Sequence, residues 1–152
     1  MSGNPVALWI PLAVLLLAHV ATPVQDALAK DIQIRTLNRG PDGSLFVFAP
    51  EVVRITPGDS VDFLAVDKGH EVHFVPGMTP HGAGPFDGPM NQDARVTFTQ
   101  PGVYVVACKP HAAMGMVAVI VVGEPVNIDN IEPSSLPGRA RTKLRSLLAT
   151  LK

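Results

Sequence analysis

A nine-residue stretch, CKPHAAMGM (residues 108–116), holds the only cysteine of the chain together with a histidine and a methionine. His111 follows Cys108 after two intervening residues, and Met116 follows His111 after four. A thiolate and an imidazole are strong ligands for copper, and a thioether is a soft, weak one. Zinc sites seldom use methionine and need three or four cysteine, histidine or carboxylate ligands. The residue types and their spacing therefore predict a copper-binding loop.

Three donors from one loop require a fourth donor from elsewhere in the chain. His70 is the best candidate, because it follows Gly69 in a turn-like position between two strand-like segments. Two histidines and a cysteine in one plane, with a long axial bond to methionine, form a blue-copper electron-transfer site. A rigid scaffold would hold one copper ion in a single geometry for both valences and leave no position open for a substrate. The ligand set predicts an electron carrier rather than an enzyme.

Other roles are open to some of these side chains. Met114 competes with Met116 for the axial position, but Met116 is favoured because it opens the next strand. His73 is expected on the surface of a strand, and His81 in a solvated loop. Cys108 could instead be a small buried hydrophobic residue, as free cysteines often are.

Two alternative functions use the same loop. A copper carrier or storage module would expose a Met-rich or Cys-rich site, but the five methionines form no such cluster. An enzyme would use Cys108 as a nucleophile with His70 or His111 as its base. No acidic third group is suggested by the spacing, and Met116 would then have no role. An intense blue oxidised form would separate an electron carrier from a carrier of colourless Cu(I).

Short segments that alternate apolar and polar residues follow one another along most of the chain, with Gly and Pro turn signals between them. In one of them, Val61, Phe63 and Ala65 fall on one face. Eight such segments lie at residues 32–37, 45–50, 51–56, 60–66, 71–75, 94–99, 103–107 and 116–122. This pattern predicts an all-β sandwich or barrel without fixing its topology.

The composition changes after Gly123. One face of an expected helix carries leucines at i, i+3, i+4 and i+7, namely Leu144, Leu147, Leu148 and Leu151. The opposite face carries the cations Arg141, Lys143 and Arg145. We expect the leucines to pack on the sandwich, and the alternative is a basic helix lying on anionic lipid. The predicted organisation is a β-sandwich at residues 30–123 and a C-terminal helical extension at residues 124–152.

The first 29 residues have the character of a secretory signal peptide. An uncharged apolar run is followed by the small-x-small pattern Ala27–Ala29 just before Lys30, although no Lys or Arg precedes the run. We expect cleavage after Ala29, export, and no attachment of the remaining chain to a membrane. The alternatives are a misassigned start codon and an uncleaved leader that anchors the chain in the membrane.

Charge is spread unevenly along the chain, whose formal net charge of −1 gives no general attraction to nucleic acid. Residues 30–138 hold seven basic and twelve acidic side chains, a net charge of −5. Five basic side chains follow Pro137, where no acidic residue occurs. Because the body of the chain is acidic and the net charge is close to zero, nucleic acid is not an expected partner.

With the four expected ligands and the stretches around them, the sequence resembles the pseudoazurins, a periplasmic branch of the cupredoxin family of type 1 blue copper proteins. The similarity covers TLNRGPDGSLFVFAP, PGDSVDFLAVDKGHEV and TQPGVYVVACKPHAAMGMVAVIVVG, and Pro110 with the AMGM run is its most specific part. The resemblance implies a two-sheet Greek-key sandwich and one copper ion bound by His70, Cys108, His111 and Met116. It also implies transient electron transfer between periplasmic donors and copper or haem reductases, such as nitrite or nitrous-oxide reductase. We expect a monomer, because transient electron carriers usually are monomers.

Two departures from the family concern residues beside the expected ligands. Relatives carry asparagine after the upstream histidine, where its amide links that loop to the cysteine loop, and this chain has Glu71. An ionised carboxylate accepts hydrogen bonds but cannot donate them, and its charge should favour Cu(II). Gly69 and Pro110 complete the set of residues that we expect to shape the site. The reduction potential is expected to lie below that of relatives.

The second departure concerns docking. Relatives surround the exposed histidine edge with lysines, of which Lys68 and Lys109 remain here within an acidic body. Electrostatic steering should therefore be weaker or suited to a different partner. The expected contact surface is an apolar collar beside these two lysines. It runs from Pro110 to Met114 and includes Ala112 and Ala113, with the edge of His111 as the electron port.

Overall fold

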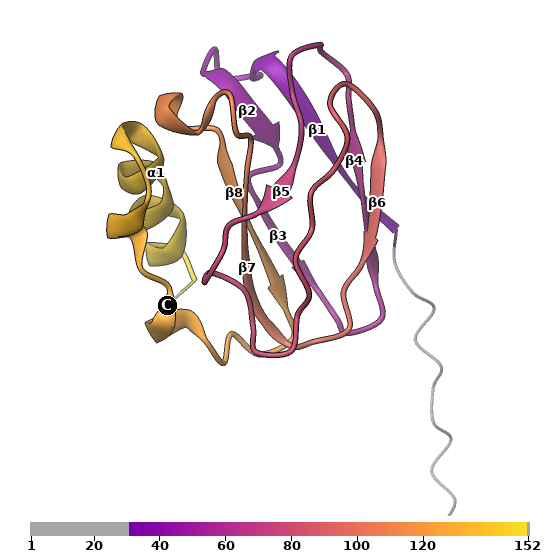
Figure 1. Cartoon of the computed structure of the whole chain (residues 1–152), viewed down its shortest axis with the longest axis vertical. Helices are drawn as coiled ribbons and strands as arrows, with labels where there is room; N and C mark the ends of the chain where they lie inside the picture. The colour runs from indigo at the N-terminus through magenta and orange to yellow at the C-terminus, as the bar shows by residue number, and fades with distance from the viewer. Residues whose placement is uncertain (1–30, 152) are drawn as a thin grey trace, which may run out of the picture.

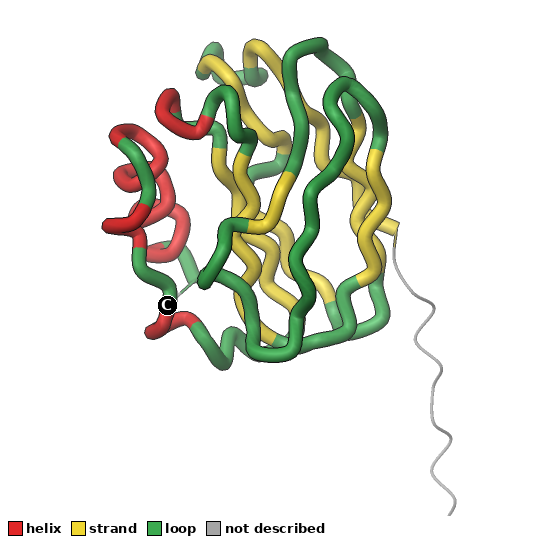
Figure 2. Tube along the Cα trace, in the orientation of Figure 1, coloured by secondary structure: helices red, strands yellow, loops and turns green. Residues whose placement is uncertain are grey.

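The computed structural model describes residues 31–151, and the leader expected at residues 1–29 lies outside them. Eight strands form two four-stranded sheets that pack face to face (Figures 1 and 2). The first sheet has the order β2-β1-β4-β6 and consists of β1 (Asp31–Arg39), β2 (Leu45–Ala49), β4 (Ser60–Leu64) and β6 (Ala94–Thr97). The second has the order β3-β8-β7-β5 and consists of β3 (Val52–Ile55), β5 (His73–Phe74), β7 (Gly102–Ala107) and β8 (Val117–Val122).

Both sheets mix parallel and antiparallel pairs. Strand β1 lies parallel to β4 with Ile34 opposite Phe63, and β3 lies parallel to β8 with Val53 opposite Ile120. The remaining pairs, β1–β2, β4–β6, β5–β7 and β7–β8, are antiparallel. Several connections cross from one sheet to the other, so that strands consecutive in sequence, such as β2 and β3, lie in different sheets.

The core between the sheets follows the alternation in the sequence. Ile34, Val61 and Phe63 of the first sheet are at most 2% exposed and pack against residues such as Ile120 of the second. Successive side chains of a strand point to opposite faces, so these residues line one face and leave the polar ones outside. The predicted all-β sandwich is confirmed.

A second core lies between the outer face of β7 and β8 and the C-terminal helix α1 (Gly138–Ala149). Leu144 is fully buried there, and Leu147 and Leu148 are at most 9% exposed. All residues of β7 and β8 are buried, because one of their faces meets the other sheet and the other face meets α1. The predicted leucine stripe therefore packs on the sandwich. Short 3-10 turns, η2 (Ile128–Asn130) and η3 (Pro133–Ser135), connect β8 to α1.

The segments that carry the expected ligands meet at one end of the sandwich, the upper end in Figure 1. Strand β7 ends at Ala107, the chain passes through the 3-10 turn η1 (Ala112–Met114), and β8 begins at Val117. The loop between β4 and β5 brings His70 to the same end. Within residues 31–151 no helix has the length and apolar character needed to cross a bilayer.

Candidate metal centre

Three of the predicted ligands converge. His70 Nδ1 lies 3.1 Å from His111 Nδ1, and Cys108 Sγ lies 3.8 Å and 3.5 Å from these two nitrogens. Within the described part of the chain this is the group of cysteine, histidine and carboxylate side chains that could hold a metal ion. His70 and Cys108 are at most 1% exposed, and His111 is half-buried.

The size of this donor triangle fits a metal ion. A triangle with these sides has its centre about 2.0 Å from each corner, close to metal–imidazole bonds of about 2.0 Å and metal–thiolate bonds of about 2.3 Å. Two imidazoles and one thiolate around a single point are the planar ligands of a blue-copper site. The three donors therefore already stand at coordination distances from a common point.

His70 is held by a hydrogen bond to Asn38 that could not be predicted from the sequence. Its Nε2 lies 3.0 Å from Asn38 Oδ1, so with Nδ1 facing the donor triangle Nε2 carries the proton and donates to this oxygen. Hydrogen bonds of this kind fix the tautomer and the ring orientation of metal-binding histidines. Burial lowers the pKa of His70, and the nearby His111 lowers it further. The ring is therefore kept neutral and available as a ligand.

Cys108 follows the last residue of β7 and is completely buried. Burial raises the pKa of its thiol, while backbone N–H groups of Glu71 and His111 act in the opposite direction by donating hydrogen bonds to the sulfur. Reactive cysteines are partly exposed and have a lowered pKa. The buried position and raised pKa of Cys108 argue against the nucleophile of an enzyme.

Backbone hydrogen bonds close the loop from Cys108 to Met116. The Met116 N–H donates to His111 O at 3.2 Å, and the Cys108 N–H donates to Met116 O at 3.2 Å. Gly115 has a φ of 103°, a left-handed conformation that favours glycine, and ends η1 there. Met116 is completely buried in the same core cluster as Cys108, whereas Met114 is 41% exposed.

Glu71 joins the two ligand-bearing loops. Its Oε1 accepts a hydrogen bond from the Lys109 backbone N–H and lies 3.2 Å from His73 Nδ1, while Oε2 is buried without a hydrogen-bond partner. The carboxylate thus accepts the bond that ties the His70 loop to the Cys108 loop. His73 was expected on a strand surface, but its side chain is only 13% exposed and lies against Glu71.

Phe46, like Asn38, contacts a predicted ligand and was not indicated by the sequence. Its ring is stacked on the His111 imidazole, with centroids 4.2 Å apart and an interplanar angle of 11°. Phe46 lies within β2 yet has a φ of 54°, which is unusual for a bulky residue. Backbone strain of this kind persists where the surrounding structure requires it. No local sequence signal marks this position.

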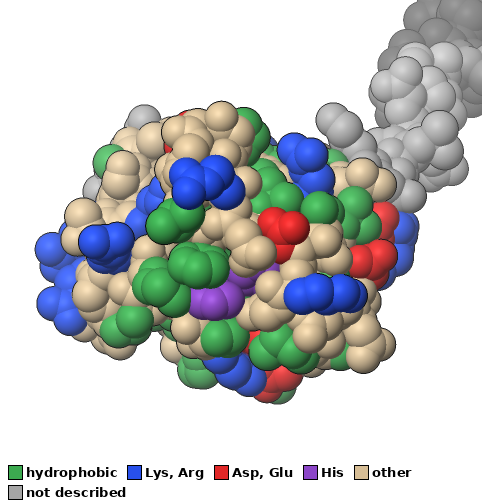
Figure 3. Space-filling model, turned by 90° about the horizontal axis from the view of Figure 1, so that it is seen from above, with side chains coloured by type: hydrophobic (Ala, Val, Ile, Leu, Met, Phe, Trp, Pro, Cys, Tyr) green, Lys and Arg blue, Asp and Glu red, His purple; other side chains and the backbone are tan. Residues whose placement is uncertain are grey.

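The remaining predicted residues surround the site at the surface. Gly69 has a φ of 94°, and its N–H donates to Asn91 Oδ1, which orients the turn before His70. The Lys109 side chain pairs with Asp87, and both are exposed. Lys68, Pro110 and Ala113 are also exposed, Ala112 is half-buried, and His81 is exposed in its loop as expected. Figure 3 shows a histidine reaching the surface among hydrophobic side chains, with Lys and Arg side chains farther out.

Comparison with known proteins places this centre in a family. The sequence model of copper-binding proteins of the plastocyanin/azurin family matches residues 34–123. Pseudoazurin of Methylorubrum extorquens is 44% identical over 116 residues, which cover 76% of each chain. The chain belongs to the pseudoazurins. Pseudoazurin of Paracoccus pantotrophus is 37% identical over 118 residues, covering 77% of this chain and 81% of the relative.

A solved structure supports the same assignment. The crystal structure of pseudoazurin from Methylobacterium extorquens AM1 superposes with a TM-score of 0.76 at 38% identity, covering 81% of this chain and 100% of that chain. As a pseudoazurin, the chain is a copper-binding electron-transfer protein, and its His-Cys-His cluster fits a single type 1 copper site.

Proposed function

We propose that this chain is a periplasmic one-electron carrier in which His70, Cys108, His111 and Met116 hold one copper ion. The donor triangle carries the proposal, because two imidazole nitrogens and one sulfur stand around a common point at coordination distances. Copper would supply the Cu(II)/Cu(I) couple. The axial role of Met116 is supported by its complete burial beside Cys108 and by its backbone bonds to Cys108 and His111.

The protein's contribution is rigidity around this point. Cys108 and Met116 adjoin the neighbouring strands β7 and β8, His70 is held by Asn38, and His111 is held by Phe46. Because the adjacent strands and these two contacts fix the donors before an electron arrives, little rearrangement should accompany a change of valence. Because His70 and Cys108 are buried, only the half-buried edge of His111 is accessible from solvent, which favours electron transfer over substrate binding.

Electrons are proposed to pass through the half-buried edge of His111, the ligand that reaches the surface. The contact surface is the apolar collar of Ala112, Ala113 and Met114 together with Pro110. Lys109 pairs with Asp87, so this lysine contributes little net field, and Lys68 stands beside Asp67 in the chain. Weak steering and a small contact suit a transient electron-transfer encounter.

The location and the partners extend this proposal. The signal-peptide pattern of residues 1–29 supports export to the periplasm. There the monomeric protein would pass single electrons from a donor protein to a copper or haem reductase, such as nitrite or nitrous-oxide reductase. The family resemblance supports this class of partner. A copper carrier is less well supported, because a carrier exposes its ligands and this chain buries His70, Cys108 and Met116.

Redox cycling of the copper-loaded protein tests the proposal. An electron carrier should be reduced and reoxidised many times with one electron per copper, and an excess of a Cu(I) chelator should remove little copper between cycles. Rapid loss of Cu(I) to the chelator after each reduction would instead support the copper carrier.

A further inference from the structure

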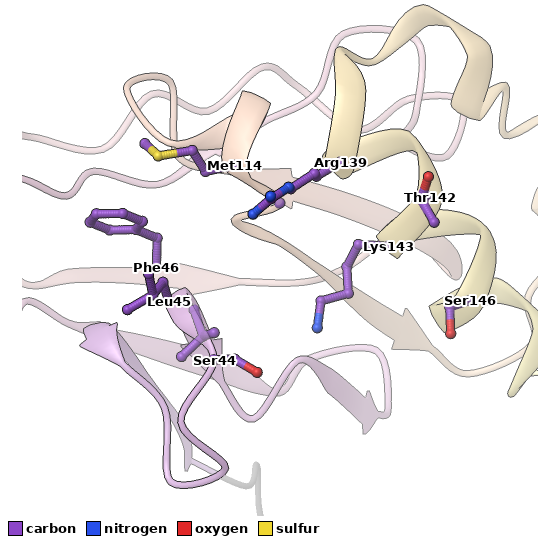
Figure 4. Close-up of a pocket in the computed structure, with 10 residues that line it drawn as sticks. Ser44, Leu45, Phe46, Met114, Arg139, Thr142, Lys143 and Ser146 are labelled. Carbon is purple, nitrogen blue, oxygen red and sulfur yellow. The ribbon is translucent and has the colours of Figure 1, made fainter.

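A groove of about 570 Å³ lies between strand β2 and helix α1, beside the metal centre (Figure 4). We call it the helix groove. Leu45 and Phe46 line it from β2, Met114 from η1, and Arg139 and Lys143 from α1. Its volume lies within the range of sites that receive a ligand side chain or a small molecule, about 300–1,000 Å³.

The wall of the groove nearest the metal centre is apolar and open to solvent. Leu45 is 54% exposed and Met114 is 41% exposed, although both are large hydrophobic residues. Between them lies Phe46, whose ring is stacked on His111. A group bound in the groove would therefore contact a ring that itself touches a predicted copper ligand.

The opposite wall is cationic. Figure 4 shows the side chains of Arg139 and Lys143 reaching from α1 into the space between the helix and β2. Lys143 pairs with Glu51 at 2.7 Å, whereas Arg139 forms no ion pair with any carboxylate of residues 32–151. Helix α1 carries four cations and no acidic residue. At this end of the molecule an unpaired positive charge thus faces an apolar surface.

These features favour one kind of occupant. A lipid surface is a poor fit, because the apolar face of α1 is buried against the sandwich and cannot enter a membrane. Arginine, methionine and aromatic residues are enriched where proteins contact one another. A carboxylate matches the charge and the forked donors of Arg139, and an aliphatic side chain matches Leu45 and Met114.

We propose that the helix groove receives an acidic segment of the redox partner, with an aliphatic side chain between Leu45 and Met114 and a carboxylate on Arg139. This inference rests on the proposed electron-carrier function and names the chemistry of its partner. Docking here displaces the contact surface from the Lys68 and Lys109 side toward α1. It also places the partner against Phe46, next to the edge of His111.

A peptide titration of the copper-loaded, reduced protein tests the groove. The probe is a capped five-residue peptide with a central leucine flanked by aspartates and glutamates, and the control peptide has serine in place of leucine. At low ionic strength, ¹⁵N chemical shifts should move at Leu45, Met114 and Arg139, and the control peptide should bind more weakly. Binding should weaken with added salt, because exposed charges are screened.

Charge reversal at two arginines of α1 provides the matched comparison. Arg139→Glu should weaken peptide binding about fivefold or more, which corresponds to about 1 kcal/mol. Arg145→Glu changes the net charge equally on the same helix but lies outside the groove, so its effect should be less than about twofold. Equal weakening by both variants, or shifts confined to the surroundings of Lys68 and Lys109, would overturn the proposal.

Other occupants give distinct results. If the parent protein floats with phosphatidylglycerol vesicles and both arginine variants lose this binding equally, the cations of α1 bind a lipid surface. That result would overturn the proposal. Self-association in sedimentation that is lost in Arg139→Glu alone would assign the groove to a second copy of this chain and also overturn it. The blue colour of the Cu(II) form reports the metal centre without any partner. Its absence would count against the proposed function, and the peptide titration would still decide the groove.

Discussion

The Phe46 ring is stacked on the imidazole of His111, with the two ring centroids 4.2 Å apart. His111 is the half-buried one of the predicted ligands. Stacked aromatic pairs contribute about 0.5–1.5 kcal/mol beyond the area they bury. Phe46→Ala should therefore speed the loss of copper to a chelator by about two- to tenfold, whereas Phe46→Tyr should not. Stopped-flow measurement of copper release checks this. Equal release rates for the alanine and tyrosine variants would show that the stack does not hold His111.

The left-handed backbone of Phe46 leads to a second prediction about the same residue. An L-residue with a side chain costs about 1–2 kcal/mol in this conformation, and glycine avoids that cost. The Phe46→Gly variant should therefore be more stable than the Phe46→Ala variant, with a free energy of unfolding about 1 kcal/mol higher, although glycine ordinarily weakens a strand. Denaturant titration of the two metal-free variants measures the difference. The opposite order would mean that the positive φ carries no strain.

Gly115 and Gly77 form a matched pair for the ligand loop. Both have a positive φ, 103° and 77°, so alanine at either position should cost about 1–2 kcal/mol of unfolding free energy. Gly115 lies between the predicted ligands His111 and Met116, and its added Cβ would lie 3.6 Å from Arg139 Cβ. An added Cβ at Gly77 would meet nothing within 4 Å. Only Gly115→Ala should change the absorption spectrum of the copper form, and an unchanged spectrum would argue against a tightly fixed loop.

The buried carboxylate of Glu71 should lower the reduction potential. At an effective dielectric constant of about 20, a unit charge near the site contributes on the order of 1–2 kcal/mol, or tens of millivolts for one electron. Glu71→Gln keeps an acceptor for the Lys109 N–H and removes the charge, so the potential should rise by tens of millivolts. Glu124→Gln, an exposed residue beyond β8, should leave it unchanged. Cyclic voltammetry showing equal potentials for Glu71→Gln and the parent would remove this role.

Copper uptake should release the thiol proton of Cys108. Burial raises the pKa of this thiol, so at pH 7 the metal-free protein carries the proton, and a metal ion must displace it to bind the thiolate. His70 has a lowered pKa and should release none. Copper affinity should therefore rise with pH below the thiol pKa, about tenfold per pH unit. Calorimetry in two buffers of different ionisation enthalpy counts the protons, and a count of zero would mean a preformed thiolate.

The fold was predictable where local pattern decides it. Residues such as Val61 and Phe63 alternate with polar neighbours, and burial of one strand face requires that alternation. The leucine stripe of α1 was equally predictable, because one helix face must be covered. The parallel pairing of β1 with β4 and of β3 with β8 was not, since alternation shows which face is buried but not which strand lies alongside.

The residues of the site also fall into those that the sequence predicted and those that only the fold brings together. Cys108 and His111 share one loop, so their types and spacing indicated a metal site, and only the Gly-His step pointed to His70. Asn38 and Phe46 come from the first two strands, and their contacts with the two histidines depend on the three-dimensional fold. The contact of His73 with Glu71 also depends on the fold, because the Glu71 side chain accepts a hydrogen bond from the Lys109 N–H of a distant loop.

Addition of Cu(II) to the metal-free protein, followed by absorption spectroscopy, tests the central claim most directly. If His70, Cys108 and His111 surround one point as the distances indicate, one equivalent of copper should produce an intense blue colour that then saturates. Cys108→Ser should bind copper without this colour. A parent protein that stays pale after one equivalent, or a Cys108→Ser variant that turns equally blue, would contradict the account.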